Sequence, residues 1–546
     1  RAQDKILIRN QLKEYTESLE KLIQEKTDLQ DHLSSLGLMI SSISHGIKGL
    51  LTGLDGGMYL LDSGLVKKDQ DRINEGWDAV KQMIERIRKM VLDILYYAKE
   101  RDLKWERIDA RTLRFYLREG VTFHSGNPLT AKDVEWTLQR LKRSESFKGI
   151  FEPVAGTKII DDHTIDLITK SPYPLLLNIA TYIFPMDRLF YSGVDDLGKP
   201  KDAIAKFEPS FARDNASGTG PFRVTERLPG TRMVFERVAS YWETHSPGNV
   251  TRIELNVIGD PSDRVNALLA GKMDMIMPVA PQDYDQVRLV DDVRLVTTAT
   301  PRIILLQLNQ DRRPEFRDVL VRQAIVHAID NRAIVHAVMR GAATAAGQQS
   351  PKGYVGHVEG LKPRFNLKRA QKMMQKAGYP DGFSCTMIAP NNRYINDEKI
   401  AATVVSMLAK INIRVKLTTM DKARYWEQFA ARQGDIQMIG WHPDTEDSAN
   451  YSEYLAMCPN KTTGYGQDNS GGYCNPIVDD LVLRSQSELD PAKRGAMLQR
   501  VEQLLYDDAA FVPLHWQNIS WAAWQRVDLE PIVNALNNPY FGDLVI

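Results

Sequence analysis

RTLRFYLREGVTFHSGNPLTAKDVEWTLQRLK, residues 111–142, combines a strand, a turn and a capped helix in one uninterrupted run. Apolar and polar side chains alternate over residues 113–118, which predicts a strand with one buried face. The segment 124–128 then collects turn-forming residues. Thr130, with Asp133 three residues later, predicts a capping box at the start of a helix. The stretch therefore predicts a domain that mixes strands and helices.

The same stretch also carries a resemblance to a known family. It contains the pattern FxLRxGVxFHxGxPLTAxDVxxTLxR, which resembles the family 5 extracellular solute-binding proteins of ABC transporters, the peptide- and nickel-binding class. The resemblance implies an α/β fold of the two-lobed periplasmic-binding-protein type II. It extends over further segments, namely GTGPF at 218–222, RVNALLAGKMD at 264–274, PEFRDVLVRQA at 314–324, AID at 328–330, AGYPDG at 377–382 and GWHPDTED at 440–447.

The composition is that of a globular protein with room for several domains. Of the 546 residues, 43% are hydrophobic and 26% are charged, which is ordinary for globular proteins. The 70 basic residues balance 70 acidic ones, so no overall field favours a nucleic-acid partner. The sequence contains no apolar run of about 18 residues, so no transmembrane helix is predicted. Because the sequence starts at Arg1 without a signal peptide, we expect a processed or truncated product.

Residues 1–109 follow a different pattern from the rest of the chain. Apolar residues recur at steps of three and four over 12–54 and again over 73–94, which predicts two helices separated by a turn at 62–70. The sequence therefore predicts a coiled-coil helical hairpin, and we expect it to form a homodimer through residues 10–98 as a four-helix bundle.

His45 lies between the apolar positions of the first of these helices, so its imidazole is expected to face solvent. Near pH 7 an exposed neutral imidazole can attack a phosphoryl group. The hairpin resembles the dimerisation and phosphoacceptor domain of sensor histidine kinases, in which His45 would be the phosphorylated residue, although Gly46 replaces the usual acid. The alternative is an ordinary solvated histidine. No ATP-binding motif follows, so a partner kinase would have to supply the phosphoryl group.

The junction at Trp105–Asp109 predicts a fusion or a truncation. The solute-binding family has strands before the equivalent of Arg111 that this sequence does not supply, so the resemblance implies an N-terminally incomplete fold. The expected compartments also differ, because a kinase hairpin belongs in the cytoplasm and a binding protein of this family in the periplasm.

After the junction, alternating strand and helix patterns predict a parallel sheet. The clearest example is a strand over 383–388, a helix over 397–411 and a strand over 413–417. The resemblance implies three domains: a small subdomain over 110–205, a large lobe over 206–300 together with 501–546, and a second lobe over 301–500.

Three cysteines occur in the sequence. Cys385 lies in an apolar run, where a small buried side chain in a strand explains it. Cys458 and Cys474 flank a polar, glycine-rich loop, and a disulfide closing such a loop would contribute about 3 kcal/mol of stability. Peptide-binding members of the family commonly have a disulfide at this place, so the resemblance implies one here and an oxidising compartment with it. Two unrelated free thiols are the alternative.

A ligand trapped between two lobes needs a protein partner for each charge, because unpaired charges are costly in a dehydrated cleft. By resemblance, Asp444 would bind the ammonium of a peptide and Trp441 would wall the pocket. Arg393 falls where peptide-binding members have an arginine for the ligand carboxylate, which a planar guanidinium suits. The remaining candidates for ligand binding are Tyr394, Asp447 and His515. The alternatives are surface ion pairs for the charged residues and a packed position in the hinge for His515.

The leading hypothesis is not enzymatic. It holds that the chain captures a peptide or similar small solute and presents it to an ABC permease by lobe closure. The competing hypothesis is a signalling protein in which the hairpin dimerises and His45 relays a phosphoryl group. No second ligand stands at a metal-site spacing from His163, and the loop 217–220 lacks the lysine of a phosphate-binding loop. No metal or other cofactor is therefore expected.

Overall fold

The computed structural model describes residues 58–67, 69, 72, 76, 77, 80, 104–204, 209–243, 246–443 and 445–546. The chain forms two compact units, Arg1–Leu103 and Lys104–Ile546. In the first unit, residues 58–67 are helical. The hairpin was predicted over residues 1–109. Its residues 1–57, which include His45, and 81–103 lie outside the described residues, and so do most of residues 68–79.

The turn predicted over residues 62–70 is wrong for its first part, because residues 58–67 are one helical segment. Leucine is a good helix former and occurs at 60, 61 and 65. The single Gly64 costs only about 1 kcal/mol relative to alanine in a helix. An isolated glycine in an apolar pattern is therefore a weak turn signal.

A four-stranded antiparallel sheet opens the second unit, in the order β1-β2-β4-β3. α3 (Ala131–Arg143) packs against it through Val134 and Ile165. The capping box predicted at Thr130 is confirmed: Asp133 accepts hydrogen bonds from the Thr130 backbone at 2.9 Å and from its hydroxyl at 2.7 Å. The strands are β1 (Lys104–Asp109), β2 (Thr112–Tyr116), β3 (Val154–Asp161) and β4 (Thr164–Thr169).

β1 corrects the predicted end of the N-terminal domain. Residues 104–109 were expected to close the helical hairpin, whereas they pair with β2 in antiparallel register from Lys104↔Tyr116 to Asp109↔Thr112. The boundary between the two units therefore lies after Leu103. Residues 105–109 are exposed throughout, so no buried alternating face marked this strand in the sequence.

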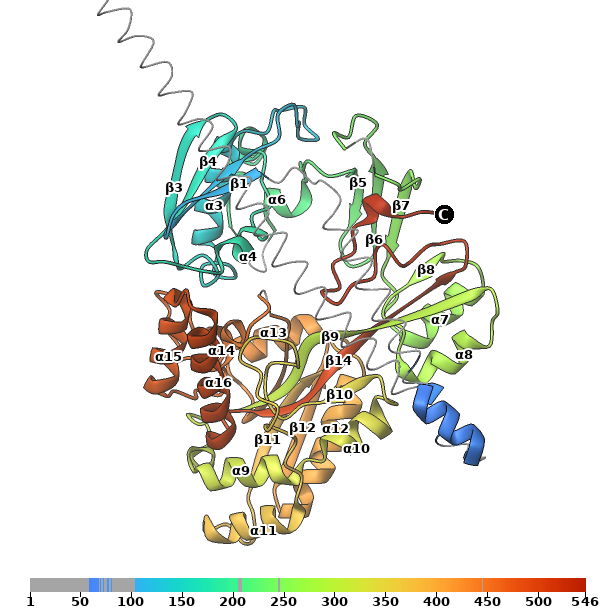
Figure 1. Cartoon of the computed structure of the whole chain (residues 1–546), viewed down its shortest axis with the longest axis vertical. Helices are drawn as coiled ribbons and strands as arrows, with labels where there is room; N and C mark the ends of the chain where they lie inside the picture. Colours follow the sequence, from blue (N-terminus) through green and yellow to red (C-terminus); the bar gives the residue numbers. More distant parts are fainter. Residues whose placement is uncertain are drawn as a thin grey trace, which may run out of the picture. The chain divides into compact units, whose positions relative to one another are not determined.

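A three-stranded antiparallel sheet follows, in the order β5-β6-β7. The C-terminal segment lies beside this sheet (Figure 1), where the Asn249 side chain donates to the Ile546 carbonyl at 2.8 Å. Trp521 and Leu529 share an apolar cluster with Phe222 at the start of β5. The elements are β5 (Phe222–Leu228), β6 (Arg232–Arg237) and β7 (Arg252–Asn256), preceded by the short helices α4 (Leu176–Ala180), α5 (Arg188–Tyr191) and α6 (Phe211–Asp214).

The largest sheet has seven strands, in the order β10-β14-β9-β13-β11-β12, with β8 paired to β14. β11 pairs in parallel with β12 and β13, so the predicted strand, helix and strand over 383–417 are confirmed. The strands are β8 (Met275–Ile276), β9 (Val293–Leu308), β10 (Ala343–Ala345), β11 (Ser384–Pro390), β12 (Arg414–Met420), β13 (Ile436–Trp441) and β14 (Val512–Trp524).

Helices pack around the strands of this sheet (Figure 1). α9 buries Val321, Ala324, Ile325 and Ala328 in one cluster with residues of β9, β11 and β13, as its apolar face predicted. The helices are α7 (Pro261–Leu269), α8 (Tyr284–Arg288), α9 (Val319–Ala328), α10 (Asn331–Ala333), α11 (Leu367–Lys376), α12 (Asp397–Leu408), α13 (Lys422–Ala430), α14 (Ser448–Leu455), α15 (Pro476–Ser487) and α16 (Pro491–Asp508).

β9 and β14 join two lobes of the second unit (Figure 1). Over 303–308, β9 lies between β13 and β14, and its side chains enter the apolar clusters around these strands. Over 293–299, β9 pairs with β14 alone, and Val293 packs in a separate cluster with α7 and α8. We call the part built around β5–β8, α7 and α8 the first lobe, and the part built around β10–β13 and α9–α16 the second lobe. Continuous strands therefore form the hinge.

The predicted lobe boundary at residue 501 cuts through a helix. α16 runs from Pro491 to Asp508, and its Val501 and Leu505 belong to the apolar cluster that contains Tyr451 and Phe511. Residues 501–508 therefore pack with the second lobe. A helix packs as one element, so the chain crosses back only within β14. Within the described ranges, every helix is too short or too polar to span a membrane.

Candidate functional site

A cavity of about 550 Å³ lies at the hinge between the two lobes. The first lobe contributes residues 259–264 and 277–282, and the second lobe contributes 391–399. Arg302 comes from β9, and Gln517 and Ile519 come from β14. The volume is within the range of about 300–1,000 Å³ that small-molecule sites occupy. We call this space the hinge cavity.

The turn that carries Arg393 is held by a buried carboxylate. Asp397 begins α12 and is 2% exposed. It accepts backbone hydrogen bonds from Arg393 and Tyr394, both at 2.9 Å. Burial raises the pKa of Asp397, and these hydrogen bonds oppose the shift. Because the carboxylate is used in this way, it fixes the turn and leaves the Arg393 guanidinium to line the cavity.

Tyr394 and Trp441 lie near the end of β13 with fixed orientations. The Tyr394 hydroxyl donates to the Gly440 carbonyl at 3.3 Å, and its ring lies 5.0 Å from the Arg393 guanidinium carbon. Trp441 donates from Nε1 to Asn450 Oδ1 at 3.1 Å and stacks on Tyr454 with ring centroids 4.6 Å apart. Tyr394 lines the hinge cavity, whereas Trp441 lies outside its lining.

Arg302 also lines the hinge cavity, and the sequence analysis missed it. It lies in β9 beside the buried Ile303, and its side chain is only partly exposed. Burial lowers the pKa of Arg302 to about 10, and the positive charge of Arg393 contributes to the same shift. The signal in the sequence was a single arginine at the start of the apolar run IILL.

The structure corrects two of the expected ligand-binding residues. Asp447 is 1% exposed, caps α14 by accepting from the Ala449 backbone at 2.9 Å, and forms an ion pair with Arg494. His515 is fully buried in β14. Neither residue lines the hinge cavity. Both belong to the packed interior, because Asp447 caps a buried helix and His515 lies within a buried strand. Asp444 lies outside the described residues.

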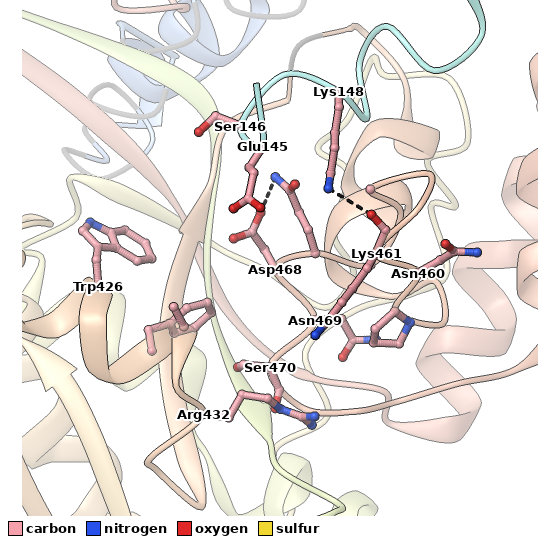
Figure 2. Close-up of a pocket in the computed structure, with 16 residues that line it drawn as sticks. Glu145, Ser146, Lys148, Trp426, Arg432, Asn460, Lys461, Asp468, Asn469 and Ser470 are labelled. Carbon is pink, nitrogen blue, oxygen red and sulfur yellow. Dashed lines mark hydrogen bonds between the residues drawn. The ribbon is translucent and has the colours of Figure 1, made fainter. Parts of the chain in front are cut away.

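A second cavity of about 870 Å³ lies beside the loop that follows α14 (Figure 2). It is lined by residues 145–148 after α3, by Trp426 and Phe429 of α13, and by the loop 459–470. Lys148 donates to the Lys461 carbonyl at 2.9 Å, a contact drawn in Figure 2. None of the described residues of the expected ligand set lines this cavity.

Arg432, which lines the second cavity, makes contacts within the protein. Arg432 donates to the Ser470 carbonyl at 2.9 Å and forms an ion pair with Asp311 at 3.0 Å. The adjoining loop is closed by a disulfide between Cys458 and Cys474, the pair that the family resemblance implied. We therefore take the hinge cavity, with its two guanidinium groups, as the candidate functional site.

The sequence matches the model of the bacterial extracellular solute-binding proteins, family 5 Middle, over residues 96–463. The chain belongs to this family. The match begins within the first unit and extends past β13 into the loop that follows α14. The family 5 assignment makes the chain a solute-binding protein, as predicted.

Several proteins of known function resemble this family 5 chain. The dipeptide-binding protein of Escherichia coli (strain K12) is 24% identical over 435 residues, which cover 74% of this chain and 78% of that protein. The glutathione-binding protein GsiB of Shigella flexneri serotype 5b is 25% identical over 424 residues, with the same two shares covered.

Solved structures show the same fold as this family 5 chain. The ABC transporter-associated periplasmic binding protein DppA from Helicobacter pylori, in complex with the peptide STSA, has a TM-score of 0.71 at 21% identity and covers 81% of this chain and 88% of its own. A dipeptide binding protein from Pseudoalteromonas sp. SM9913, in complex with Met-Leu, has a TM-score of 0.72 at 20% identity, with 81% and 89% covered. The predicted α/β periplasmic-binding-protein fold is confirmed.

Proposed function

We propose that this family 5 protein captures a short peptide in the hinge cavity and presents it to an ABC permease. The observation that supports the proposal is Arg393, which lines the cavity and whose guanidinium lies over the Tyr394 ring without an ion-pair partner among the described residues. A peptide carboxylate can accept two parallel hydrogen bonds from such a group. The dipeptide- and glutathione-binding relatives, and the peptides held by the two similar structures, favour a peptide over other solutes.

The other site residues have defined roles in this proposal. Asp444 binds the ammonium of the ligand, since a carboxylate is the partner that a buried cation needs. Trp441 lies outside the lining of the hinge cavity, at the end of β13, and would contact only a ligand that extends beyond the cavity, with an orientation fixed by its stacking on Tyr454. Tyr394 holds the Arg393 side chain through the contact between ring and guanidinium.

Closure of the two lobes about β9 and β14 would trap the peptide. Hinge closure needs elements that bend without breaking the structure on either side. Continuous strands with β-bulges fit that need, and β14 has register shifts between Pro513 and His515 and between Trp516 and Asn518. Closure would remove water from the hinge cavity and strengthen each charged contact within it.

The proposal includes a location outside the cytoplasm. The family is described as extracellular. The disulfide between Cys458 and Cys474 is of a kind that persists in oxidising compartments.

A peptide screen by differential scanning fluorimetry and isothermal titration calorimetry tests the proposal. Di-, tri- and tetrapeptides should raise the melting temperature, and the peptides that do so should bind with a measurable Kd. Arg393→Gln should weaken binding by about tenfold or more, because hydrogen bonds to a charged group are lost. Arg500→Gln, at an exposed position on α16, is the matched control. A screen in which no peptide raises the melting temperature would reject the proposal.

A second candidate function concerns residues 1–103 and rests on the sequence pattern around His45. In it, the hairpin forms a homodimer and His45 accepts a phosphoryl group from a partner kinase. Light scattering on the intact chain would test the dimer. Phosphohistidine on the wild type, absent from His45→Gln, would test the acceptor. Unlabelled wild-type protein after incubation with active kinases would count against this candidate.

A further inference from the structure

We infer that the hinge cavity selects peptides with two carboxylates, and that Arg302 binds the second one. The inference rests on the proposed function, because it assigns Arg393 to the main-chain carboxylate at the C-terminus of the peptide. Arg302 then binds the side-chain carboxylate of the same ligand residue. The preferred ligands are therefore short peptides that end in Asp or Glu.

The first argument is that the Arg302 guanidinium lines the cavity without an acidic partner. Its side chain is partly buried in β9, next to the fully buried Ile303 and Ile304. No ion pair and no side-chain hydrogen bond joins this guanidinium to another residue in the described parts of the chain. A cation withdrawn from water without a partner is costly. An anionic group entering the cavity would remove that cost.

The second argument concerns the acids that line the same cavity, because each is engaged locally. Asp260 caps α7 by accepting from the Asp263 backbone at 2.9 Å. Asp397 accepts from three backbone groups at the start of α12. Glu398 accepts from the Thr419 hydroxyl at 2.7 Å. Asp397 contacts the backbone of Arg393, but none of these contacts involves the guanidinium group of Arg302 or of Arg393.

The third argument is that the positive charges converge on the cavity. Arg264 also lines it, but this side chain is used by the carbonyls of Ile258, Gly259 and Pro278 at 2.7–3.3 Å. Lys399 lines the cavity with an exposed side chain. Arg302 and Arg393 are the two remaining guanidinium groups, and the charge of Arg393 adds to burial in lowering the pKa of Arg302. The field of Arg302 also reaches His442, where burial and this charge together lower the imidazole pKa. Two neighbouring guanidinium groups suit two carboxylates.

Lobe closure would turn this arrangement into selectivity. A peptide with a neutral C-terminal residue brings one carboxylate and leaves the second guanidinium unpaired as water is expelled. A peptide that ends in Asp or Glu brings a partner for each. The unpaired charge lowers the affinity for a peptide with a neutral C-terminal residue. The added hydrogen bonds raise the affinity for a peptide that ends in Asp or Glu.

Isothermal titration calorimetry on the intact chain with Ala-Glu, Ala-Gln and Ala-Ala tests the inference. Ala-Glu and Ala-Gln have nearly the same shape, so they differ mainly in charge. We expect wild type to bind Ala-Glu about tenfold or more tightly than Ala-Gln, as for one charged hydrogen-bonded pair. In Arg302→Gln the two affinities should agree within about threefold, whereas Arg302→Lys should keep part of the preference.

Three controls separate the possible outcomes. Arg500→Gln should keep the wild-type preference for Ala-Glu over Ala-Gln. Arg393→Gln should lower the affinity for all three peptides. The melting temperature of unliganded Arg302→Gln should equal or exceed that of wild type, because the substitution removes a partly buried charge that has no ion-pair partner among the described residues. Equal wild-type affinities for Ala-Glu and Ala-Gln would overturn the inference and leave peptide binding intact. Absence of binding by every peptide would instead overturn the proposed function.

Discussion

Two arginines of this protein, one buried and one partly buried, are in opposite situations. Arg494 is 6% exposed and forms an ion pair with Asp447, and its Nε donates to the Ser485 carbonyl at 3.1 Å. Arg302 lines a cavity and lacks such partners among the described residues. A buried ion pair whose hydrogen bonds are satisfied indicates a structural role. A cation in a cavity without an ion-pair partner indicates a role in ligand binding.

Asp447→Asn tests the structural side of this contrast. Removing one charge of a buried pair leaves the other uncompensated, so the free energy of unfolding should fall by about 3–5 kcal/mol. Urea denaturation followed by circular dichroism measures the change. Asp480→Asn is the matched control, because the ion pair between Asp480 and Arg484 is exposed and should contribute no more than about 1 kcal/mol. Equal effects of the two substitutions would refute the structural role.

His515 should make the fold sensitive to acid. Both of its ring nitrogens are buried without a hydrogen-bond partner, and burial lowers its pKa to about 4. The unfolded chain has the ordinary value of 6.5, so it binds a proton first as the pH falls. The contribution of His515 to stability is thus complete above pH 6.5 and is lost between pH 6.5 and about pH 4. The loss amounts to about 3 kcal/mol.

His515→Leu should remove this part of the acid sensitivity. Leucine has no hydrogen-bond donor or acceptor in its side chain. It therefore loses no hydrogen bond at this position, because neither nitrogen of His515 has a partner. Urea denaturation gives the unfolding free energies of wild type and variant from pH 7.5 to pH 4. Over this range the unfolding free energy of the variant should fall by about 3 kcal/mol less than that of wild type. Parallel curves for the two proteins would show that the imidazole is not kept neutral by burial.

At the scale of elements, the loop between Cys458 and Cys474 depends on its disulfide. The residues inside the loop are polar and glycine-rich. Replacing both cysteines by serine should lower the free energy of unfolding by about 3 kcal/mol for a loop of about 15 residues. Thermal unfolding with and without reductant gives the readout. The variant should be insensitive to reductant, and an unchanged melting temperature of reduced wild type would contradict the prediction.

The third cysteine does not interfere with that experiment. Cys385 is 4% exposed in β11, and burial raises the pKa of its thiol to about 12. Because the thiolate is the reactive form, this residue cannot exchange with the disulfide at neutral pH. The effect of reductant therefore reports on one disulfide.

Elements with local signals could be predicted from the sequence, and those that depend on distant partners could not. The capping box of Thr130 and Asp133 and the order β11, α12, β12 were visible because residues close in the chain specify them. β1 was missed because its exposed side chains carry no pattern, and only pairing with β2 defines it.

The candidate site divides in the same way. Arg393 was found because a family motif marked its position, and the turn at Asp397 then keeps it at the cavity. Arg302 was missed because only the approach of several separate segments shows that it faces a cavity. The interior positions of Asp447 and His515 depend on helix and strand packing. Residue types alone suggested ligand contacts for both.

At the scale of the whole molecule, residues 104–546 contain what a folded unit requires. The three sheets and nearly all of the described apolar core lie within this range. A fragment with residues 104–546 should therefore unfold cooperatively and bind peptides with the affinity of the intact chain, within about threefold. Calorimetry of both proteins makes the comparison. A fragment that lacks a cooperative transition would show that residues 1–103 complete the fold.

The two register shifts in β14 also matter to a protein engineer. They leave Trp516 and Asn518 in an irregular part of a strand that runs through both lobes. Backbone rotation is cheapest where a hydrogen-bonding ladder is already interrupted. A dye attached at Asn518, between the cavity-lining residues Gln517 and Ile519, would therefore report on movement of the lobes about this strand. The same irregularity that lets the strand bend makes this position the natural attachment point for a fluorescent reporter.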